Sequence, residues 1–451
     1  MFRKIIALMA SAFIITSVLA GCGNSRNAPQ QTSTAAPAQA ASTQATTQET
    51  KKEPVKITFL NGTVEMVDFW TQYFDKYNAS NSDGITVEHQ YQKEATKNLQ
   101  VRMASGDIPD LIGCDPTQDM IDNNKFVDLT DSPWWGQLNP AVKGFSTDAK
   151  SGKAFSIPTL QGAVGIYYNK AIFNELGLKP ANTWKEFVSN LQTIKQKKPG
   201  VVPFYMGGKD GWMLQHLAEF TFQAPAKQSM SFSEQQKAMQ SNDLAKLGWD
   251  ASPNGALATL AADLTDLQKQ GLINSNIVTA TYDNQTTEFA AGKAATISQG
   301  LWAAGDIQKK NPDISNFGFS QYPAIMDGAK PAIGSTIDGK LFISAESKNV
   351  DAVKKVVEVI LQPDNMKAIS EARKSPSSNP SVQSDWGYLR EDVGNLLKDP
   401  NIASITFSAM PTAFSGDDEG RLFQELFAGK YKQPVDFAKA WVDAWNKGFS
   451  K

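Results

Sequence analysis

Between residues 55 and 112 the chain alternates segments with a two-residue hydrophobic period and segments with helical spacing of apolar side chains. This order limits the possible folds more than any other feature of the sequence. The strand-like segments are residues 55–59, 85–91 and 108–112, and helical segments lie between them. Strand, helix and strand in this succession predict an α/β fold, in which helices cover a parallel sheet.

Polar residues follow the first and third of these strands, where ligands bind in open α/β sheets. Glu65 comes after the first strand and Asp115 after the third. Both side chains can accept hydrogen bonds from a ligand hydroxyl. Glu65 can equally be a solvated acid at a helix start, and Asp115 can cap the next helix.

The N-terminus has the features of a cleaved export signal, expected over residues 1–21. Arg3 and Lys4 precede an apolar run from Ile5 to Ala20, which is short for a membrane span with normal flanks. The run ends in Leu-Ala-Gly before Cys22, an order that resembles the lipobox of bacterial lipoproteins. The resemblance implies that Cys22 carries the lipid (palmitate). The alternative is an ordinary signal peptide with an incidental cysteine.

Residues 22–54 are expected to form a linker. They are almost entirely Gly, Asn, Ser, Thr, Ala, Gln and Pro, and such a composition cannot offset the entropy of ordering. No transmembrane helix is expected after them.

The rest of the chain is long enough for two lobes, since one core seldom serves so many residues. The full sequence has 44 basic and 46 acidic residues, so no basic surface for nucleic acid is expected. Beyond Cys22 the only cysteine is Cys114, which excludes an internal disulfide. Cys114 is expected to be a small side chain at a strand end.

Further helices carry clear signals. Thr183 and Glu186 have the spacing of a capping box. Ser252 and Pro253 are expected to begin another helix. Trp441 and Trp445 are one turn apart in a helix over residues 435–449 and are expected in the core.

Several segments in order resemble the extracellular solute-binding proteins of ABC importers, in the family that captures sugars and oligosaccharides. These segments are residues 152–158 (GKAFSIP), 165–170 (GIYYNK), 173–178 (FNELGL), 183–187 (TWKEF), 289–295 (FAAGKAA), 300–302 (GLW), 317–323 (FGFSQYP) and 347–353 (SKNVDAV).

The resemblance implies two α/β lobes of the periplasmic-binding-protein type II class, joined by crossover strands, with the ligand in the cleft between them. Lobe one is expected to contain residues 55–155 and 290–338. Lobe two is expected to contain residues 156–289 and 339–451.

The resemblance also suggests contact residues. Trp302 follows a glycine at a position where relatives stack a sugar, although it can instead be a buried residue beside the hinge. Trp212, in a glycine-rich loop, can stack on a sugar or pack at a helix start. The side chain of Gln161 can face the sugar, or it can hydrogen-bond to the backbone of the turn in which it lies. Asp338, at the last crossover, and Asp283, a weaker candidate, complete the set.

We therefore expect a binding protein rather than an enzyme, with no cofactor and no metal. It would capture a sugar or oligosaccharide at the outer face of the cell membrane, as a lipid-anchored monomer, and deliver it to permease subunits. A Gram-positive cell would suit such an anchor. The alternatives are a non-sugar solute such as a peptide or polyamine, and a lipid-anchored glycoside hydrolase, which would need paired carboxylates.

The lipid assignment predicts that Cys22→Ala protein leaves the membrane, because lipid would be its only anchor, yet binds solute as the natural protein does. Fractionation of cells and binding measured in solution check the two parts. Mutant protein that stays in the membrane fraction would contradict the tether.

Overall fold

The structure is a computed structural model that describes residues 54–148, 150–218, 224–405, 411 and 414–449. Cys22 and the expected signal peptide lie outside this range, as does all but the last residue of the expected linker.

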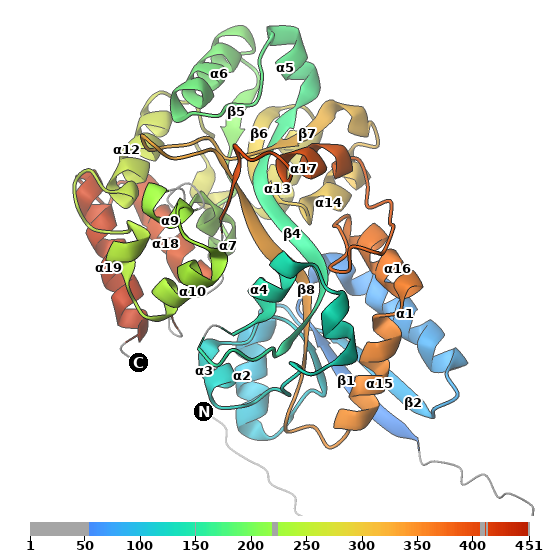
Figure 1. Ribbon diagram of the computed structural model, residues 1–451. Helices are drawn as coiled ribbons and strands as arrows, with labels where there is room; N and C mark the ends of the chain where they lie inside the picture. The colour runs from blue at the N-terminus through green and yellow to red at the C-terminus, as the bar shows by residue number, and fades with distance from the viewer. Residues whose placement is uncertain (1–53, 149, 219–223, 406–410, 412–413, 450–451) are drawn as a thin grey trace, which may run out of the picture. The chain divides into compact units, whose positions relative to one another are not determined.

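Helices and strands alternate along the chain (Figure 1). The strands are β1 (Val55–Asn61), β2 (Ile85–Tyr91), β3 (Leu111–Gly113), β4 (Ser156–Asn169), β5 (Val202–Tyr205), β6 (Ala294–Gly300), β7 (Phe317–Ser320), β8 (Ala332–Ile343) and β9 (Ala403–Ile405). The α-helices are α1 (Val67–Ser80), α2 (Ala95–Ser105), α3 (Gln118–Asp122), α4 (Pro140–Ser146), α5 (Lys170–Leu176), α6 (Trp184–Lys197), α7 (Gly211–Leu214), α9 (Pro225–Gln228), α10 (Phe232–Gln240), α11 (Leu244–Leu247), α12 (Ala256–Lys269), α13 (Tyr282–Ala290), α14 (Ala303–Lys310), α15 (Val350–Ile360), α16 (Pro363–Arg373), α17 (Arg390–Leu396), α18 (Gly416–Phe427) and α19 (Pro434–Phe449). Short 3₁₀ helices are η1 (Val64–Met66), η2 (Pro133–Gln137), η3 (Gln215–Leu217), η4 (Ile277–Thr279) and η5 (Ile314–Asn316).

One sheet runs through the described chain in the order β2-β1-β3-β8-β4-β6-β5, with β7 paired to β4 and β9 paired to β8. The first three strands are parallel, as the sequence predicts. The long strands β4 and β8 are antiparallel to each other, and both cross the middle of Figure 1. This pairing joins the β1 end of the sheet to the β5 end.

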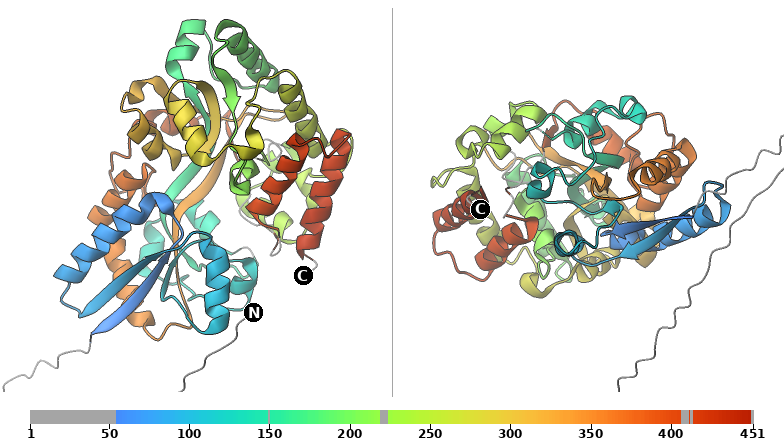
Figure 2. Two further views of the ribbon diagram at one scale, coloured as in Figure 1. Left: turned by 180° about the vertical axis from the view of Figure 1, so that it is seen from behind. Right: turned by 90° about the horizontal axis from the view of Figure 1, so that it is seen from below.

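The β1 end has a core of its own, called here the N-terminal core. It contains Phe59 from β1, Phe74 from α1, Leu341 from β8 and Val353 from α15, among others. The aromatic residues of α1 supply much of its volume, with Trp70 and Phe74 both against Phe59. The view from behind in Figure 2 shows α1 beside β1 and β2.

The other end of the sheet has two adjoining clusters, called together the second core. One cluster gathers Tyr167 of β4, Phe289 of α13, Ile297 of β6 and Phe319 of β7. The other holds α6, α12, α18 and α19, with Trp441 and Trp445 fully buried as expected.

These cores differ from the lobes expected from the sequence. Strand β6 pairs with β4 and β5, so most of residues 290–338 pack in the second core and not with residues 55–155. The end of β8 and helix α15, within residues 339–451, pack in the N-terminal core. The chain returns to the N-terminal core within β8 and not near residue 290, because β6 is an inner strand of the second part of the sheet.

Two helix starts were predicted from local sequence signals, and the structure confirms the first of them. The capping box of Thr183 and Glu186 is present at the start of α6. The helix expected at Ser252 and Pro253 begins only at Ala256, with Gly255 before it. Ser252 instead donates its backbone amide to Asp250 Oδ1 at 2.9 Å, in a turn. None of the described helices combines the length and the apolar composition needed to cross a bilayer.

A carboxyl group lies inside the second core. Glu419 of α18 is fully buried, and its Oε1 accepts a hydrogen bond of 2.8 Å from Trp441 Nε1 of α19. Burial raises the pKa of Glu419 to about 8, and the Trp441 hydrogen bond and the charge of Lys227 oppose the shift only in part. The folded protein therefore holds this carboxyl protonated at neutral pH.

The raised pKa predicts a pH-dependent loss of stability. Between pH 4.5, the ordinary value, and about pH 8 the folded state binds more protons than the unfolded state, so stability falls as the pH rises. Glu419→Gln keeps an acceptor for Trp441 but cannot ionise. The natural protein should lose stability as the pH rises, and the mutant should not. We therefore expect the unfolding temperature of the mutant, relative to that of the natural protein, to increase from pH 5 to pH 9. Glu358→Gln, on the exposed side of α15, serves as the control, and an equal gain in both mutants would contradict the assignment.

Candidate ligand-binding site

Three charged side chains meet where β8 passes between the two cores. Arg373, the last residue of α16, donates from Nε to Asp338 Oδ2 at 2.8 Å and from Nη2 to Asp338 Oδ1 at 3.1 Å. Its Nη1 lies 3.1 Å from Glu65 Oε2 of η1. A guanidinium matches a carboxylate in this two-point geometry, so Arg373 fixes Asp338, and it pairs with Glu65 through a single ion-pair contact.

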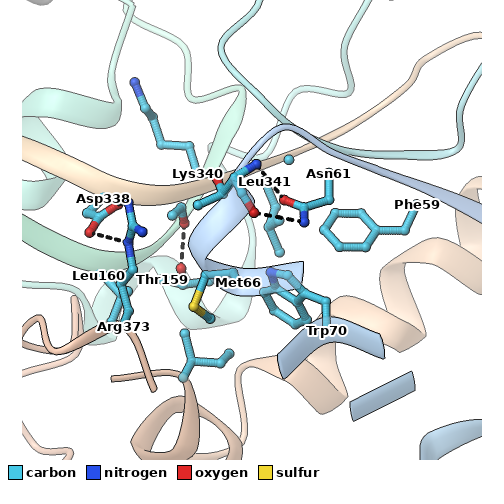
Figure 3. A pocket seen from close by; sticks show the side chains of 14 residues that line it. Phe59, Asn61, Met66, Trp70, Thr159, Leu160, Asp338, Lys340, Leu341 and Arg373 are labelled. Atoms are coloured by element: carbon cyan, nitrogen blue, oxygen red, sulfur yellow. Dashed lines mark hydrogen bonds and ion pairs between the residues drawn. The ribbon is translucent and has the colours of Figure 1, made fainter. Parts of the chain in front are cut away.

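The arginine is buried, with 8% of its side chain exposed. Burial lowers the pKa of Arg373, but the carboxylates of Asp338 and Glu65 outweigh burial and raise it, so the guanidinium keeps its charge. Figure 3 shows Arg373 and Asp338 at one side of a small pocket that Asn61, Trp70 and other residues line.

Aromatic rings from α7, η3, α13 and the start of α14 form a cluster, called here the aromatic cluster: Trp212, His216, Tyr282 and Trp302. The Trp212 ring centroid lies 5.6 Å from Tyr282 and 6.1 Å from His216. His216 lies 5.4 Å from Trp302. Both tryptophans are partly exposed, whereas His216 is buried, so they can offer ring surface to a ligand.

A chain of side-chain amides holds Trp302 in place. Its Nε1 donates to Gln299 Oε1 at 2.9 Å, and Gln299 Nε2 donates to Gln285 Oε1 at 2.8 Å. Gln285 Nε2 in turn donates to the Tyr205 carbonyl at 3.1 Å. Both glutamines are buried, so the indole has a fixed edge. Such fixed aromatic surfaces lose little entropy on binding a ligand.

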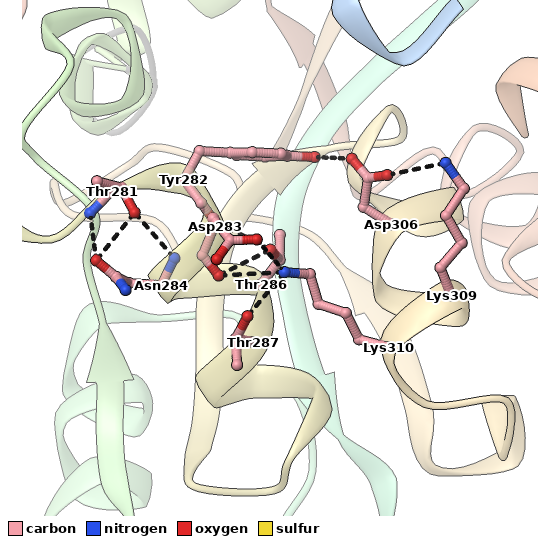
Figure 4. A network of polar contacts seen from close by, with 9 residues as sticks. All are labelled: Thr281, Tyr282, Asp283, Asn284, Thr286, Thr287, Asp306, Lys309 and Lys310. Atoms are coloured by element: carbon pink, nitrogen blue, oxygen red, sulfur yellow. Dashed lines mark hydrogen bonds and ion pairs between the residues drawn. The ribbon is translucent and has the colours of Figure 1, made fainter. Parts of the chain in front are cut away.

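Tyr282 links the aromatic cluster to the charged residues. Its hydroxyl donates to Asp306 Oδ2 of α14 at 3.1 Å (Figure 4). Burial raises the pKa of Tyr282 well above its ordinary value, and the nearby charges of Glu65 and Asp306 raise it further. Glu65 of the N-terminal part and Tyr282 of the second part are therefore close enough to interact. Burial also lowers the pKa of His216 to about 3, which keeps its ring neutral.

Four of the seven candidate residues meet another candidate through a shared partner: Glu65 and Asp338 through Arg373, and Trp212 and Trp302 through His216. Asp283 faces elsewhere, because its exposed carboxylate pairs with Lys310 on the outer side of α13 (Figure 4). Asp115 is exposed and pairs with Lys340 Nζ at 2.5 Å, beside the pocket of Figure 3. Gln161 lies in β4 opposite Ile337, and its backbone amide donates to the Pro376 carbonyl at 2.9 Å.

Three residues of these groups were not predicted as site residues from the sequence: Arg373, Tyr282 and His216. Arg373 lies 35 residues from Asp338, and no local pattern connects the two. Tyr282 could have been found, since it directly precedes the candidate Asp283. Cys114 is as expected: it follows β3, and burial raises the pKa of its thiol to about 12, which leaves it neutral and unreactive.

Known proteins resemble this chain in sequence and in fold. The sequence profile described as "Bacterial extracellular solute-binding protein" matches residues 72–393, more than half of the chain. The chain therefore belongs to this family of solute-binding proteins. A multiple sugar-binding protein of Streptococcus mutans is 27% identical over 347 residues, 75% of this chain and 78% of the relative. A melibiose/raffinose/stachyose-binding protein of Bacillus subtilis is 28% identical over 298 residues, 65% of this chain and 66% of the relative.

Among solved structures, a sugar transporter of Bacillus licheniformis in complex with stachyose superimposes with a TM-score of 0.71 at 24% identity. The match covers 87% of this chain and 100% of the other. This confirms the expected two-lobed α/β fold. The relatives are named as binding proteins and not as enzymes, which agrees, at the level of the family, with the expected binding role.

The packing around Trp302 predicts the effect of a single methyl group. A Cβ added to Gly300 of β6 would lie 2.2 Å from Trp302 Cζ3, so the ring must move. We expect Gly300→Ala to weaken ligand binding at least tenfold, and Trp302→Ala to cost about 2 kcal/mol or more, as for a buried aromatic anchor. Calorimetric titration of the ligand measures both.

The matched control is Gly305→Ala in α14, whose added Cβ would make only an ordinary contact, at 3.8 Å from Lys374. Unchanged affinity in a folded Trp302→Ala protein would reject the role of Trp302.

Proposed function

We propose that this protein captures a neutral sugar or oligosaccharide outside the cell membrane and delivers it to the permease of an ABC importer. The aromatic cluster, with the carboxylates of Asp306 and Glu65 near its Tyr282, is the observation that carries the proposal. The sugars named for the relatives, melibiose, raffinose and stachyose, are neutral and agree with it.

The chemistry of the site suits a carbohydrate. A sugar ring has apolar C–H faces, which stack on indole rings, and a rim of hydroxyls, which need acceptors. Trp302 and Trp212 supply the rings. The carboxylates of Glu65 and Asp338 supply acceptor oxygens, and Arg373 already pairs with both of them.

The same charges argue against an anionic ligand. The carboxylates of Glu65 and Asp306 act on Tyr282, and the nearby buried cation, Arg373, is already paired with Glu65 and Asp338. A uronate or a phosphate would meet uncompensated negative charge in a poorly solvated place. A polyamine is the second candidate, since these carboxylates would attract an amine and the indole rings could bind it through cation–π contacts.

Delivery is proposed to depend on lobe closure. The lobes are proposed to be the N-terminal core and the second core, with β4 and β8 as the connecting strands. A solute that contacts Glu65 from one side and Trp302 from the other would favour the closed state, because only there are both contacts made.

The protein is proposed to be a monomer, held at the outer face of the membrane by lipid on Cys22 and a linker over residues 22–54. A tether of about 30 flexible residues has an r.m.s. reach of roughly 30 Å, which suits capture near a permease. A cell without an outer membrane, as in Gram-positive bacteria, would need such an anchor.

The proposal predicts which solutes stabilise the protein. Residues 55–451 are heated with melibiose, raffinose, stachyose, galacturonate oligomers, polyamines and peptides, and unfolding is followed. A ligand at 100 times its dissociation constant adds about 2.7 kcal/mol, enough for a clear rise in the midpoint. We expect a rise with neutral sugars, none with the uronates, and compaction of the sugar complex in X-ray scattering.

A rise only with amines or peptides would overturn the sugar assignment, and release of cleaved glycan would establish an enzyme instead. A confirmed complex with an unchanged radius of gyration would remove the closure mechanism.

A further inference from the structure

Residues 207–212 (GGKDGW) form the glycine-rich segment that carries Trp212. This segment contacts one face of α18, a helix from the far C-terminal part of the chain. The contacts come from Asp417, Gly420 and Gln424, which are three and four residues apart and so share one face of the helix. These three residues are called here the α18 clamp.

Two polar side chains of the clamp bind the backbone of this segment. Asp417 Oδ1 accepts a hydrogen bond of 3.0 Å from the Trp212 backbone amide. Gln424 Nε2 donates to the Gly208 carbonyl at 2.6 Å and to the Lys209 carbonyl at 3.3 Å. The segment is therefore fixed at its start and at Trp212 itself.

Between these polar contacts the two backbones touch. A Cβ added to Gly420 would lie 1.9 Å from the Gly211 carbonyl oxygen, far inside any allowed contact. A Cβ on Gly211 would lie 2.7 Å from the Asp417 carbonyl oxygen. Only glycine at both positions permits this approach, so α18 and the residue preceding Trp212 cannot move independently.

The rest of the buried surface of α18 is anchored in the second core. Phe423 is fully buried there, and Leu422, Leu426 and Phe427 are almost so. A capping box of Ser415 and Asp418 secures the start of the helix. The clamp thus belongs to a rigid element. The start of the segment is also held by the Ala280 carbonyl, which accepts from the Gly208 and Lys209 amides, whereas the Trp212 amide is held by Asp417.

We propose that the α18 clamp positions Trp212 for ligand contact, and that Asp417, Gly420 and Gln424 are positioning residues that set the affinity of the site without touching the ligand. The proposal rests on the proposed function in one respect, that Trp212 contacts a sugar. Released from the clamp, the Trp212 ring would leave its place against Tyr282 and His216.

The test measures the Trp212 ring and the affinity separately. Protein labelled with 5-fluorotryptophan gives a fluorine resonance for Trp212, assigned by its loss in Trp212→Phe. We expect Asp417→Ala to shift or broaden that resonance in the ligand-free protein and to weaken binding of raffinose about tenfold. Asp417→Asn keeps an acceptor oxygen and should restore both to within about twofold of the natural protein.

A double-mutant cycle separates positioning from general damage. In a Trp212→Ala background, Asp417→Ala should weaken raffinose binding no further. Asp436→Ala is the matched control: Asp436 Oδ2 accepts from the Gln433 backbone amide at 2.9 Å at the start of α19, and its loss should leave the Trp212 resonance unchanged. Gly420→Ala gives a steric version of the same test.

An unchanged Trp212 resonance in Asp417→Ala, or a loss of affinity that persists in the Trp212→Ala background, would overturn the proposal. If no sugar binds, the proposed function fails, while the resonance alone still decides whether the clamp positions the ring.

Discussion

The antiparallel pairing of β4 with β8 is the constraint on which the rest of this structure depends. The two strands stay in register from Ser156 opposite Phe342 to Val164 opposite Gly334. Each strand contributes side chains to both cores, as Ile157 and Tyr167 of β4 do. The pairing is close: a Cβ on Gly162 would lie 2.7 Å from Thr336 Cγ2. The sheet is therefore continuous, and the two cores share its central strands, β4 and β8.

This arrangement explains why the candidate site combines a group of charged residues with a group of aromatic residues. Asp338 lies in the shared strand β8, and Arg373 lies at the end of α16. Arg373 pairs with Asp338 and with Glu65, which comes from the N-terminal part of the chain. The aromatic rings come from the second part of the chain and are fixed by buried amides. Carboxylate acceptors and flat aromatic rings are the two features that the proposed sugar ligand would need, for its hydroxyl rim and its C–H faces.

Part of this could be predicted from the sequence. The parallel β1–β2–β3 unit, the cap of α6 and the buried Trp441 and Trp445 all follow from short-range patterns of period and spacing. The division of the chain between cores could not, because the partner of β6 is decided by pairing across the sheet and not by any local signal.

The site shows the same limit. Trp302 and Trp212 were marked by neighbouring glycines, but the ion pairs of Arg373 join residues from three distant segments. Asp283 was a weaker candidate from the sequence, and its neighbour Tyr282 was not considered. Helix geometry turned one outward to Lys310 and the other inward to Asp306.

The separation of Trp212 from the helix that holds it has a consequence for biogenesis. Asp417 and Gln424 lie 205 and 216 residues after their partners in the glycine-rich segment. A chain exported from its N-terminus would present β1 to β6 long before α18 leaves the translocation channel. Contacts of such long range form late in folding and at a high cost in loop entropy. The binding surface would thus be among the last parts of the protein to mature, and a chain truncated shortly before its end would resemble the native fold over most of its length while lacking an ordered site.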